Sequence, residues 1–418
     1  MKVCVVGHGG REHALAHVLG RSCDVVVTPG NPGIPGSTST PATEIDADLY
    51  VIGPEAPLVD GLADELRAAG GLVFGPGADG ARLEGSKAWM KELLVAAGVP
   101  TAAHGSFTEA EAALGYLDTM GDLFVIKTDG LAAGKGVLVT ESRGEAADAV
   151  RSYLSGEAFG EAGRRVVIEE GLTGPELSVL AVCDGHRAVP LAPAQDFKRI
   201  GNGDVGPNTG GMGAYSPVPV AGDDVVAEVM DRAVGPTLAA LRQRGIDYRG
   251  VLYAGLMLTP HGIKVLEYNV RFGDPEAQVV LPRLRSDLAE LLAGAAAGSL
   301  TTVPEYGPDA AVTVVCAAAG YPAAPRVGDP IVGIDEANAE EGVTVFCAGV
   351  APAGDHQDGR RLNTAGGRVL AVTGQGPDLT TARDRAYAGV THIDWPGRYV
   401  RTDIAADAVQ GTLGRVAP

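Results

Sequence analysis

Three polar residues near position 270 alternate along a segment with the composition of a β-strand. Glu267, Asn269 and Arg271 lie two residues apart, and alternate residues of a strand share one face. A carboxylate and an amide oxygen side by side suit a hard cation such as Mg²⁺, which substrate phosphates would also bind. An arginine next to them can hold a phosphate through two hydrogen bonds. The other face of the strand would carry Leu266, Tyr268 and Val270.

The alternative for this strand is a solvated face, on which charged and apolar residues also alternate. The segment Asp274-Pro275-Glu276 follows directly and favours the functional interpretation. A second acidic group, Glu169, Glu170 and Glu176, lies at and just after another expected strand. We expect at least one of these three to be an ordinary surface acid.

A glycine-rich segment, Lys127 to Gly136, joins two expected strands. It is not a Walker loop, because Gly136 stands where that motif requires serine or threonine after Lys135. Its three glycines and small residues predict a flexible flap that can lie close over a polyphosphate, with Lys127 and Lys135 supplying positive charge. The alternative is a mobile surface loop without a ligand.

A longer polar segment runs from Gln195 to Pro217. It contains Asp196 and Lys198 and continues into Gly210-Gly211-Met212, so that it offers charges, hydroxyls and backbone donors to a small polar substrate. We expect residues 203–213 to form one long loop, and long loops inside folded regions are usually functional. The alternative is a solvated turn.

The first glycine-rich turn, Gly7-His8-Gly9-Gly10-Arg11-Glu12, lies between an expected strand and an expected helix. A dinucleotide-binding fingerprint would need glycine where Glu12 stands, and no acidic residue closes the second strand. We therefore interpret the turn as amides at a helix N-terminus, with Arg11 beside them, for a single phosphate. A plain strand–helix turn is the alternative.

Histidine and cysteine carry no recognisable chemistry in this sequence. The eight histidines are scattered without metal spacing, and His8 and His13 are more easily explained as packed or surface residues. The five cysteines are an odd number with no C-x-x-C, which argues against a disulfide framework or a thiolate zinc site and favours a reducing cytosol.

Strands alternate with helices over the first 70 residues, which predicts a parallel sheet with its ligand loops at the strand C-termini. The expected elements are strands at 2–6, 24–28 and 49–52 and helices at 11–19 and 58–69. The loops after these strands should meet at one crevice.

From about residue 86 the pattern becomes α+β and mostly antiparallel. We expect a helix at 86–97, strands at 124–127, 136–140, 165–170, 177–183, 186–191, 250–258 and 263–270, and a helix at 223–244 kinked at Pro236. The tail adds strands at 311–317, 344–348 and 369–373 and a closing helix at 379–392. The fold class is therefore α/β combined with α+β.

Composition excludes several classes of protein. The 418 residues include 33 lysines and arginines and 52 aspartates and glutamates, giving a formal charge of −19. Such a surface argues against broad nucleic-acid binding, although a local site can still take an anionic substrate. No apolar run approaches the ~20 residues of a membrane helix, and the chain opens on a strand rather than a signal peptide. We expect a cytoplasmic protein that binds neither nucleic acid nor membrane, and a monomer.

Seven motifs together resemble the glycinamide ribonucleotide synthetase (phosphoribosylamine–glycine ligase) family of the ATP-grasp superfamily. They are GHGGREHAL, PGNPG, GPEAPLVDG, LEGSKAWMK, IKTDGLAAGKGV, QDFKRIGNGDVGPNTGGMGAYSP and EYNVRFGDPEAQ, and the last three are highly specific. The resemblance covers essentially the whole chain. It implies a carbon–nitrogen ligase that makes glycinamide ribonucleotide, ADP and phosphate from glycine, 5-phosphoribosylamine and ATP, through glycyl phosphate, in purine biosynthesis.

The resemblance also implies roles for individual residues. The metal ligands for Mg²⁺ or Mn²⁺ would be Glu267 and Asn269. ATP would be bound by Lys87, Lys127, Gly134, Lys135, Gly136, Glu169, Glu170, Leu172 and Glu176. Arg271, Asp196 and Lys198 would be catalytic. The substrates would be bound by Gly9, Gly10, Arg11, Glu12, Asn31, Pro54, Glu55, Gly210, Gly211, Met212, Gly273 and Asp274.

The family also implies three domains: a Rossmann-like domain at 1–84, an ATP-grasp region at 85–308 with a mobile lid at about 104–172, and a small α+β domain at 309–418. The chain departs from the family in one place. Only 21 residues separate Asn31 from Gly53, so part of the first domain is expected to be trimmed.

Three rival interpretations remain. Another ATP-grasp enzyme, such as a formate-using transformylase or a biotin carboxylase subunit, would share the flap and the cation pair but not GPNTGGMGAYSP. A Rossmann dehydrogenase would bind NAD, which Glu12 disfavours. A non-catalytic nucleotide-binding module would lack one of the charged groups. The observation that separates them is ADP release that requires glycine and 5-phosphoribosylamine together.

Overall fold

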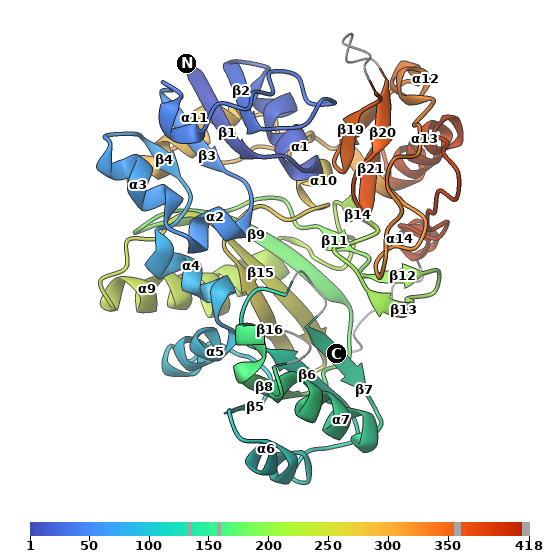
Figure 1. Cartoon of the computed structure of the whole chain (residues 1–418). Helices are drawn as coiled ribbons and strands as arrows, with labels where there is room; N and C mark the ends of the chain where they lie inside the picture. Colours follow the sequence, from blue (N-terminus) through green and yellow to red (C-terminus); the bar gives the residue numbers. More distant parts are fainter. Residues whose placement is uncertain (133–135, 157–159, 355–360, 412–418) are drawn as a thin grey trace.

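A parallel sheet forms the N-terminal region in the computed structural model, which describes residues 1–418 except 133–135, 157–159, 355–360 and 412–418. The strand order is β2-β1-β3-β4, with every pair parallel, as the alternating pattern predicts. The strands are β1 (Lys2–Gly7), β2 (Asp24–Pro29), β3 (Leu49–Ile52) and β4 (Val73–Phe74). Helix α1 (Gly10–Leu19) follows β1, so its N-terminus lies at the carboxyl edge of the sheet (Figure 1).

The prediction of a single helix at 58–69 is wrong. The chain forms two short helices, α2 (Glu55–Val59) and α3 (Leu62–Ala68), followed by α4 (Ala78–Gly85). Gly61 separates α2 from α3 in the left-handed conformation, at φ 89°. A helix cannot continue through that conformation, and glycine adopts it without steric cost.

The central sheet is antiparallel, with the order β10-β9-β15-β16. Its strands are β9 (Glu176–Asp184), β10 (Ala188–Pro190), β15 (Arg249–Thr259) and β16 (Gly262–Asn269). The register between β15 and β16 shifts at Leu266, because Gly255 faces Glu267 while Leu256 faces Val265. Such a bulge leaves one extra residue in β16 and changes which face the following side chains occupy.

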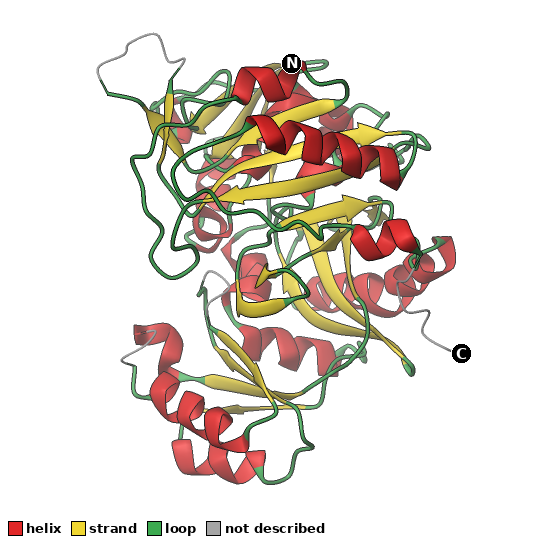
Figure 2. Cartoon of the chain, turned by 90° about the vertical axis from the view of Figure 1, so that its right-hand side faces the viewer, coloured by secondary structure: helices red, strands yellow, loops and turns green. Residues whose placement is uncertain are grey.

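Residues 104–170 form a separate lobe below the central sheet, at the bottom of Figure 1 and again in Figure 2. Its antiparallel sheet has the order β5-β8-β6-β7, formed by β5 (His104–Phe107), β6 (Phe124–Thr128), β7 (Val137–Thr140) and β8 (Val166–Glu170). Helices α6 (Ala110–Leu117) and α7 (Arg143–Leu154) and the 3₁₀ helix η2 (Gly160–Arg164) complete it. A small hydrophobic core of its own lies between these helices and the sheet. The lobe therefore does not depend on the main core.

The C-terminal sheet takes strands from two regions of the chain. Its order is β11-β14-β17-β21-β18, formed by β11 (Gln195–Asp196), β14 (Gly213–Ser216), β17 (Ala310–Ala317), β18 (Val343–Cys347) and β21 (Arg368–Gly376). Helix α13 (Leu379–His392) packs on it, with α12 (Ile334–Ala339) beside β18. A small hairpin, β19 (Val350–Pro352) and β20 (Leu362–Thr364), and α14 (Ala406–Gln410) lie at its margin. The division expected at residue 308 thus crosses one continuous sheet, and the domain boundaries stay a prediction.

The helix expected at 223–244 is irregular one turn before its proline. It consists of α8 (Asp223–Val229), a π-helical turn (Met230–Val234) and α9 (Gly235–Gln243). Pro236 lies in the first turn of α9 and has no N–H to donate to the preceding helical turn. The π-helical turn directly before it accommodates the hydrogen bond that proline cannot donate.

The long loop expected at 203–213 is also wrong in part. Residues 199–208 form a hairpin of β12 (Arg199–Gly201) and β13 (Val205–Asn208), and only 209–212 are irregular before β14. Glycines 203 and 206 adopt positive φ angles within and just after the turn, which lets this polar sequence fold back on itself.

Three helices complete the main body: α5 (Lys87–Ala96), α10 (Ala277–Val280) and α11 (Leu288–Ala296), with a 3₁₀ turn at Ala42–Glu44. One large hydrophobic cluster contains side chains from the N-terminal, central and C-terminal sheets, so these regions share a core. Among the described residues, no helix is long and apolar enough to span a membrane.

Candidate active site

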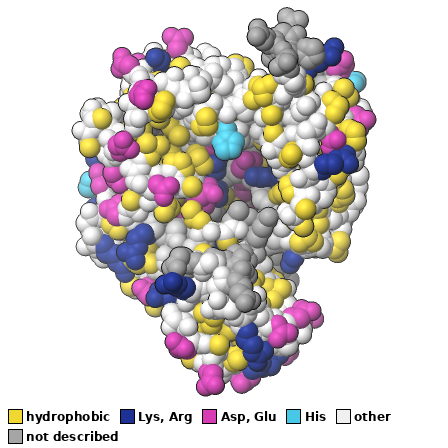
Figure 3. Space-filling view, in the orientation of Figure 1, with side chains coloured by type: hydrophobic (Ala, Val, Ile, Leu, Met, Phe, Trp, Pro, Cys, Tyr) yellow, Lys and Arg dark blue, Asp and Glu magenta, His cyan; other side chains and the backbone are white. Residues whose placement is uncertain are grey.

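A cavity of about 1040 Å³ lies where the central sheet, the lobe of residues 104–170 and the C-terminal sheet meet. Figure 3 shows the face hollowed at its centre, with acidic and basic side chains gathered around the hollow. Single-ligand pockets are usually about 300–1,000 Å³. The volume is therefore enough for a nucleotide together with a second small molecule.

One end of the cavity is apolar and lies between two sheets. Its lining includes Val125 and Val139 from the lobe, Leu172 from the connection to β9, and Leu256, Met257 and Leu266 from β15 and β16. Flat apolar walls on both sides suit an aromatic base. Glu170 and Glu176 border the same end.

Lys87 reaches this space from the first residue of α5. Ser86 caps the helix by accepting a hydrogen bond from the amide of Trp89. The ammonium of Lys87 donates to the carbonyl of Gly130 at 2.8 Å, so the helix is joined to the start of the glycine-rich segment. Burial lowers the pKa of Lys87, and the nearby carboxylate of Glu267 works against that shift.

A buried cluster of two lysines and one glutamate supports the same end. The carboxylate of Glu169 accepts from Lys91 at 2.7 Å and from Lys127 at 2.8 Å, and its side chain is only 2% exposed. Lys91 is fully buried and also donates to Thr101. Burial favours the neutral acid, but the two lysines outweigh it and lower the pKa of Glu169. Lys127 lines the cavity and Lys91 does not.

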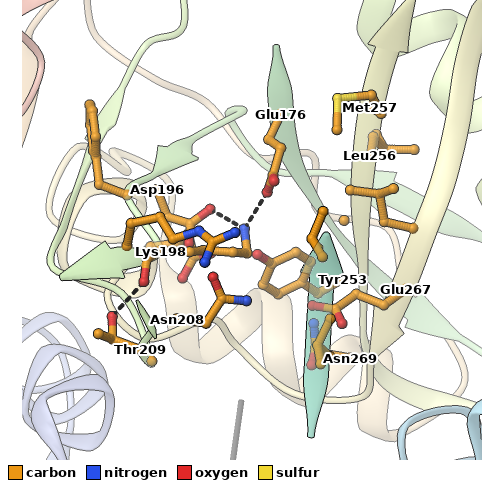
Figure 4. A pocket seen from close by; sticks show the side chains of 18 of the residues that line it. Glu176, Asp196, Lys198, Asn208, Thr209, Tyr253, Leu256, Met257, Glu267 and Asn269 are labelled. Carbon is orange, nitrogen blue, oxygen red and sulfur yellow. Dashed lines mark hydrogen bonds and ion pairs between the residues drawn. The ribbon is translucent and has the colours of Figure 1, made fainter. Parts of the chain in front are cut away.

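Glu267 and Asn269 lie side by side on the cavity wall, below Tyr253 in Figure 4. The bulge in β16 alters the predicted pattern, since Leu266 also lines the cavity instead of facing away. Val270 is buried in the core as expected, and Tyr268 is buried there but also borders the cavity. Two oxygen donors of this kind fit a hard divalent cation that phosphates also bind.

Arg271, two residues after Asn269, lies in a cluster of charged side chains. Its guanidinium donates to Glu84 at 2.8 Å and to the amide oxygen of Asn269 at 3.1 Å, and it lies 3.4 Å from Glu55. Arg11 lies 4.0 Å from the same carboxylate oxygen of Glu55. Burial opposes ionisation of Glu55, but the two arginines prevail and lower its pKa. This end of the cavity therefore offers two fixed guanidinium groups.

Lys198 also lines the cavity and lies between two carboxylates (Figure 4). Its ammonium is 2.6 Å from Asp196 and 2.7 Å from Glu176. Burial raises the pKa of Asp196 to about 7, with Glu276 and Glu176 adding to the shift and Lys198 opposing it. The attraction of Lys198 lowers the pKa of Glu176. The lysine is therefore held in its charged form.

Most of the predicted site residues meet at this cavity. They are Arg11, Glu55, Lys87, Lys127, Gly136, Glu169, Glu170, Leu172, Glu176, Asp196, Lys198, Gly210, Glu267, Asn269, Arg271 and Asp274. Gly134 and Lys135 lie outside the described residues. No comparison tests the individual roles, which stay predictions.

Eight predicted substrate contacts are not part of the cavity lining: Gly9, Gly10, Glu12, Asn31, Pro54, Gly211, Met212 and Gly273. Glu12 is buried, and its carboxylate binds the amide of Gly9 at 2.6 Å and the Nε of Arg11 at 2.5 Å. The amide of Gly9, expected to bind a phosphate, is therefore used within the turn.

The side chain of Asn31 is also occupied by hydrogen bonds within the protein, and these bonds link two regions of the chain. Its amide nitrogen donates to the carbonyls of His8, Cys347 and Ala348, and its oxygen accepts from Gly33. This side chain joins the N-terminal loop to β18. Met212 is fully buried.

Several lining residues were not expected from the sequence. Glu84 pairs with Arg271, Tyr253 donates to the buried Glu276 at 2.5 Å, and Arg368 donates to the carbonyls of Gly210 and Asp274 at 2.6 Å each. Glu84 belongs to the LEGSKAWMK motif, which was a usable signal. Arg368 lies in a strand of the C-terminal sheet, and nothing local in the sequence connects it to the cavity.

The described residues hold no cluster of three or more histidine, cysteine, aspartate or glutamate side chains arranged for a metal. The pair Glu267 and Asn269 thus fits a cation that a ligand's phosphates help to hold. Together, the apolar walls, the buried lysines and the two arginines beside Glu55 fit a nucleoside triphosphate and a second anionic substrate.

Family models match the chain in three successive parts. They are the N domain of phosphoribosylglycinamide synthetase over residues 1–84, its ATP-grasp (A) domain over 85–277 and its C domain over 311–407. The chain is 48% identical over 426 residues to the phosphoribosylamine–glycine ligase of Streptomyces coelicolor. That alignment covers 98% of this chain and 99% of the relative.

Solved structures agree with these matches. Phosphoribosylamine–glycine ligase from Thermotoga maritima superposes with a TM-score of 0.86 at 35% identity, covering 97% of this chain and 100% of that one. The biotin carboxylase domain of 2-oxoglutarate carboxylase from Hydrogenobacter thermophilus, solved with MgADP and bicarbonate, gives 0.70 at 16% identity, covering 96% of this chain and 91% of that one. At that identity it shares the fold alone. The expected ATP-grasp fold is confirmed.

Proposed function

This chain belongs to the phosphoribosylglycinamide synthetase family, and we propose that it ligates glycine to 5-phosphoribosylamine with ATP. The products are glycinamide ribonucleotide, ADP and phosphate, as in purine biosynthesis. The observation that carries the proposal is the composition of this cavity. The cavity joins an apolar, lysine-bordered end to an end with two arginines, and its lining comes from all three regions of the chain.

In the proposed reaction no protein side chain becomes covalently attached. A carboxylate oxygen of glycine attacks the γ-phosphorus of ATP, and ADP leaves. The nitrogen of 5-phosphoribosylamine then attacks the carbonyl carbon of glycyl phosphate. Phosphate leaves with the oxygen that glycine supplied, and the nitrogen loses a proton. Positioning and charge neutralisation supply most of the catalysis in phosphoryl transfer of this kind.

The chain's own residues supply that positioning. The apolar end takes the base, and Lys87 and Lys127 are placed for the phosphates. Lys198, kept charged by Asp196 and Glu176, faces the same space and can neutralise charge as it develops on the phosphoryl group. Arg271 and Arg11 lie at the far end, where an anionic second substrate would bind.

Glu267 and Asn269 would hold the divalent cation that ATP-grasp chemistry uses. When bound, that cation would draw electron density from the phosphate oxygens and make the γ-phosphorus easier to attack. We propose Mg²⁺ or Mn²⁺ for this position. Hard oxygen donors suit both ions.

The glycine-rich segment would cover the nucleotide and keep water from glycyl phosphate. We propose the lobe of residues 104–170 as the lid that carries it. Its separate core supports this assignment, since a lobe with its own core can change position without disrupting the body.

We also propose that the protein is a cytoplasmic monomer. Size-exclusion chromatography tests the monomeric state.

The proposal is tested by measuring ADP release with each substrate added singly and together. Rapid release is expected only with ATP, glycine and 5-phosphoribosylamine all present. Bicarbonate in place of glycine is the matched control, because the structural neighbour named above is a biotin carboxylase domain. Release that depends on bicarbonate and ignores glycine would refute the proposal and favour a carboxylase.

A further inference from the structure

The segment from Tyr399 to Ile404 is fixed firmly to the C-terminal sheet. Tyr399 exchanges both backbone hydrogen bonds with Ala317 of β17, at 2.8 and 2.9 Å. Arg383 of α13 donates to the carbonyls of Thr402 and Ile404, at 2.8 and 2.9 Å. The segment is therefore a rigid part of the C-terminal region.

Arg401 projects from this segment and is 1% exposed. It forms a two-pronged pair with Asp403, at 2.8 and 2.7 Å. Its remaining terminal nitrogen donates to the carboxylate of Asp204 at 2.6 Å and to the carbonyl of Arg199 at 3.0 Å. Both acceptors belong to the β12–β13 hairpin, so this guanidinium connects the C-terminal region to that hairpin.

The tip of the hairpin is held by three further hydrogen bonds. Asn202 and Thr402 bond to each other in both directions, at 2.8 and 3.0 Å, and the amide of Gly203 donates to Asp403 at 2.7 Å. Asp204 adopts a φ of 54°, a left-handed conformation that residues other than glycine rarely take. This conformation is held by the contacts around it.

The hairpin leads directly to the proposed catalytic residues. The guanidinium of Arg401 stacks over the ring of Phe197, 4.9 Å from its centroid. Phe197 stands between Asp196 and Lys198, and the carbonyl of Lys198 accepts two bonds from Thr209 at the other end of the hairpin. Any shift of the hairpin would therefore move Lys198.

We propose that Arg401 is a positioning residue for the ligation reaction, fixing Lys198 through its contacts with Phe197, Arg199 and Asp204. The inference rests on the proposed function, since Lys198 matters only if a phosphoryl group is transferred at this cavity. Arg401 is not part of the cavity lining. It acts through the hairpin.

The first test replaces Arg401 by methionine, which keeps an apolar stem in place of the arginine stem and removes the charged guanidinium group. A displacement of about 1 Å at a reacting group can cost on the order of 100-fold in rate. We expect kcat to fall by about 10- to 100-fold, with a much smaller change in KM for ATP. Arg401→Lys, which keeps the charge over Phe197, should recover part of the loss.

The matched control is Arg326→Met in the same region. The side chain of Arg326 pairs with Asp329 at 2.7 Å and bonds to the carbonyl of Pro396, and Arg326 is not itself a residue of the hairpin or of the cavity lining. It should leave kcat unchanged. A purely structural role for Arg401 would instead lower the folded fraction and leave kcat per folded molecule intact, which would overturn the inference.

Asp204→Asn keeps the test decisive even if Arg401→Met does not fold, because Arg401 stays paired with Asp403. We expect kcat to fall about threefold and the effect to be non-additive with Arg401→Met, since both changes weaken the same ion pair. Unchanged kcat in this variant would overturn the inference. Wild-type activity in the same assay tests the proposed function separately, because only the ratio of variant to wild type tests Arg401.

Discussion

Lys127 lines the cavity and is paired with the buried carboxylate of Glu169. Glu169 binds both Lys127 and Lys91, but only Lys127 can reach a ligand. Because Lys91 satisfies Glu169 independently, Lys127 can move to a phosphate without leaving a buried carboxylate unpaired. An unpaired buried charge is strongly destabilising.

Replacing Lys91 by methionine tests this arrangement. Glu169 would then have Lys127 as its only cation and would hold it more tightly. We expect KM for ATP to rise about tenfold, about 1.4 kcal/mol, with a smaller effect on kcat. The fold should persist, because the remaining pair is neutral. Steady-state kinetics over a range of ATP concentrations provides the measurement.

Lys264→Met is the control for that variant. Lys264 lies near Lys91 and contacts the carbonyl of Thr101 at 3.4 Å, but it makes no ion pair with Glu169. It should leave KM for ATP unchanged. If the Lys91→Met protein folds and has a normal KM for ATP, then Lys127 does not need Lys91 in order to leave Glu169 and bind a phosphate.

Glu267 is the residue on which the metal assignment depends most. Glu267→Ala removes the carboxylate donor from the cavity wall and should lower ATP-dependent ligation by at least about 100-fold, while the circular dichroism spectrum stays unchanged. Glu228→Gln, which removes an exposed carboxylate paired with Arg232 at 2.5 Å on the surface of α8, is the matched control. Near-normal turnover in Glu267→Ala would defeat the assignment.

At the scale of elements, most strands could be predicted because each is a short run of buried apolar residues. Individual contacts could not be predicted where a partner distant in the sequence decides the conformation. Leu266 turned toward the cavity because β15 and β16 pair with a bulge, which an apolar run does not reveal. Arg401 and Arg368 are held by residues about 200 and 160 positions away, and Asn31 by Cys347. No local pattern in the sequence carries that information.

Helix α1 and strand β18 form a contact whose strength should depend on pH. The ring nitrogen Nδ1 of His13 accepts the amide N–H of Cys347 at 2.8 Å, and the ring packs edge-on against Phe346. Burial lowers the pKa of His13 from 6.5 to about 4, with His17 adding to the shift. The folded state therefore binds fewer protons than the unfolded state between pH 4 and 6.5, and stability is lost as pH falls through that window.

From those two pKa values, titration of His13 should lower the free energy of unfolding by about 2 kcal/mol between neutral pH and pH 5. His13→Asn can accept the same N–H but cannot titrate, so its stability should fall less on acidification. Urea unfolding of both proteins at pH 7.5 and pH 5 gives the comparison. Parallel losses in the two proteins would show that His13 does not titrate in this window.

At the scale of the molecule, the cavity exists because distant regions are joined. Pairing of β14 with β17 makes the segment that carries Asp196 and Lys198 part of the C-terminal sheet. The main core extends through all three regions, whereas the lobe of residues 104–170 has its own. One frame with a shared core therefore faces a lobe with a core of its own, which we propose as the cover that a reactive acyl phosphate requires.

The origin of the oxygen in the released phosphate tests the central claim most directly. With glycine labelled by ¹⁸O in both carboxylate oxygens, formation of glycyl phosphate requires one labelled oxygen to leave with phosphate and one to stay in the amide. We expect phosphate carrying a single ¹⁸O, formed only when ATP and 5-phosphoribosylamine are present. Unlabelled phosphate alongside the ligated product would contradict the account.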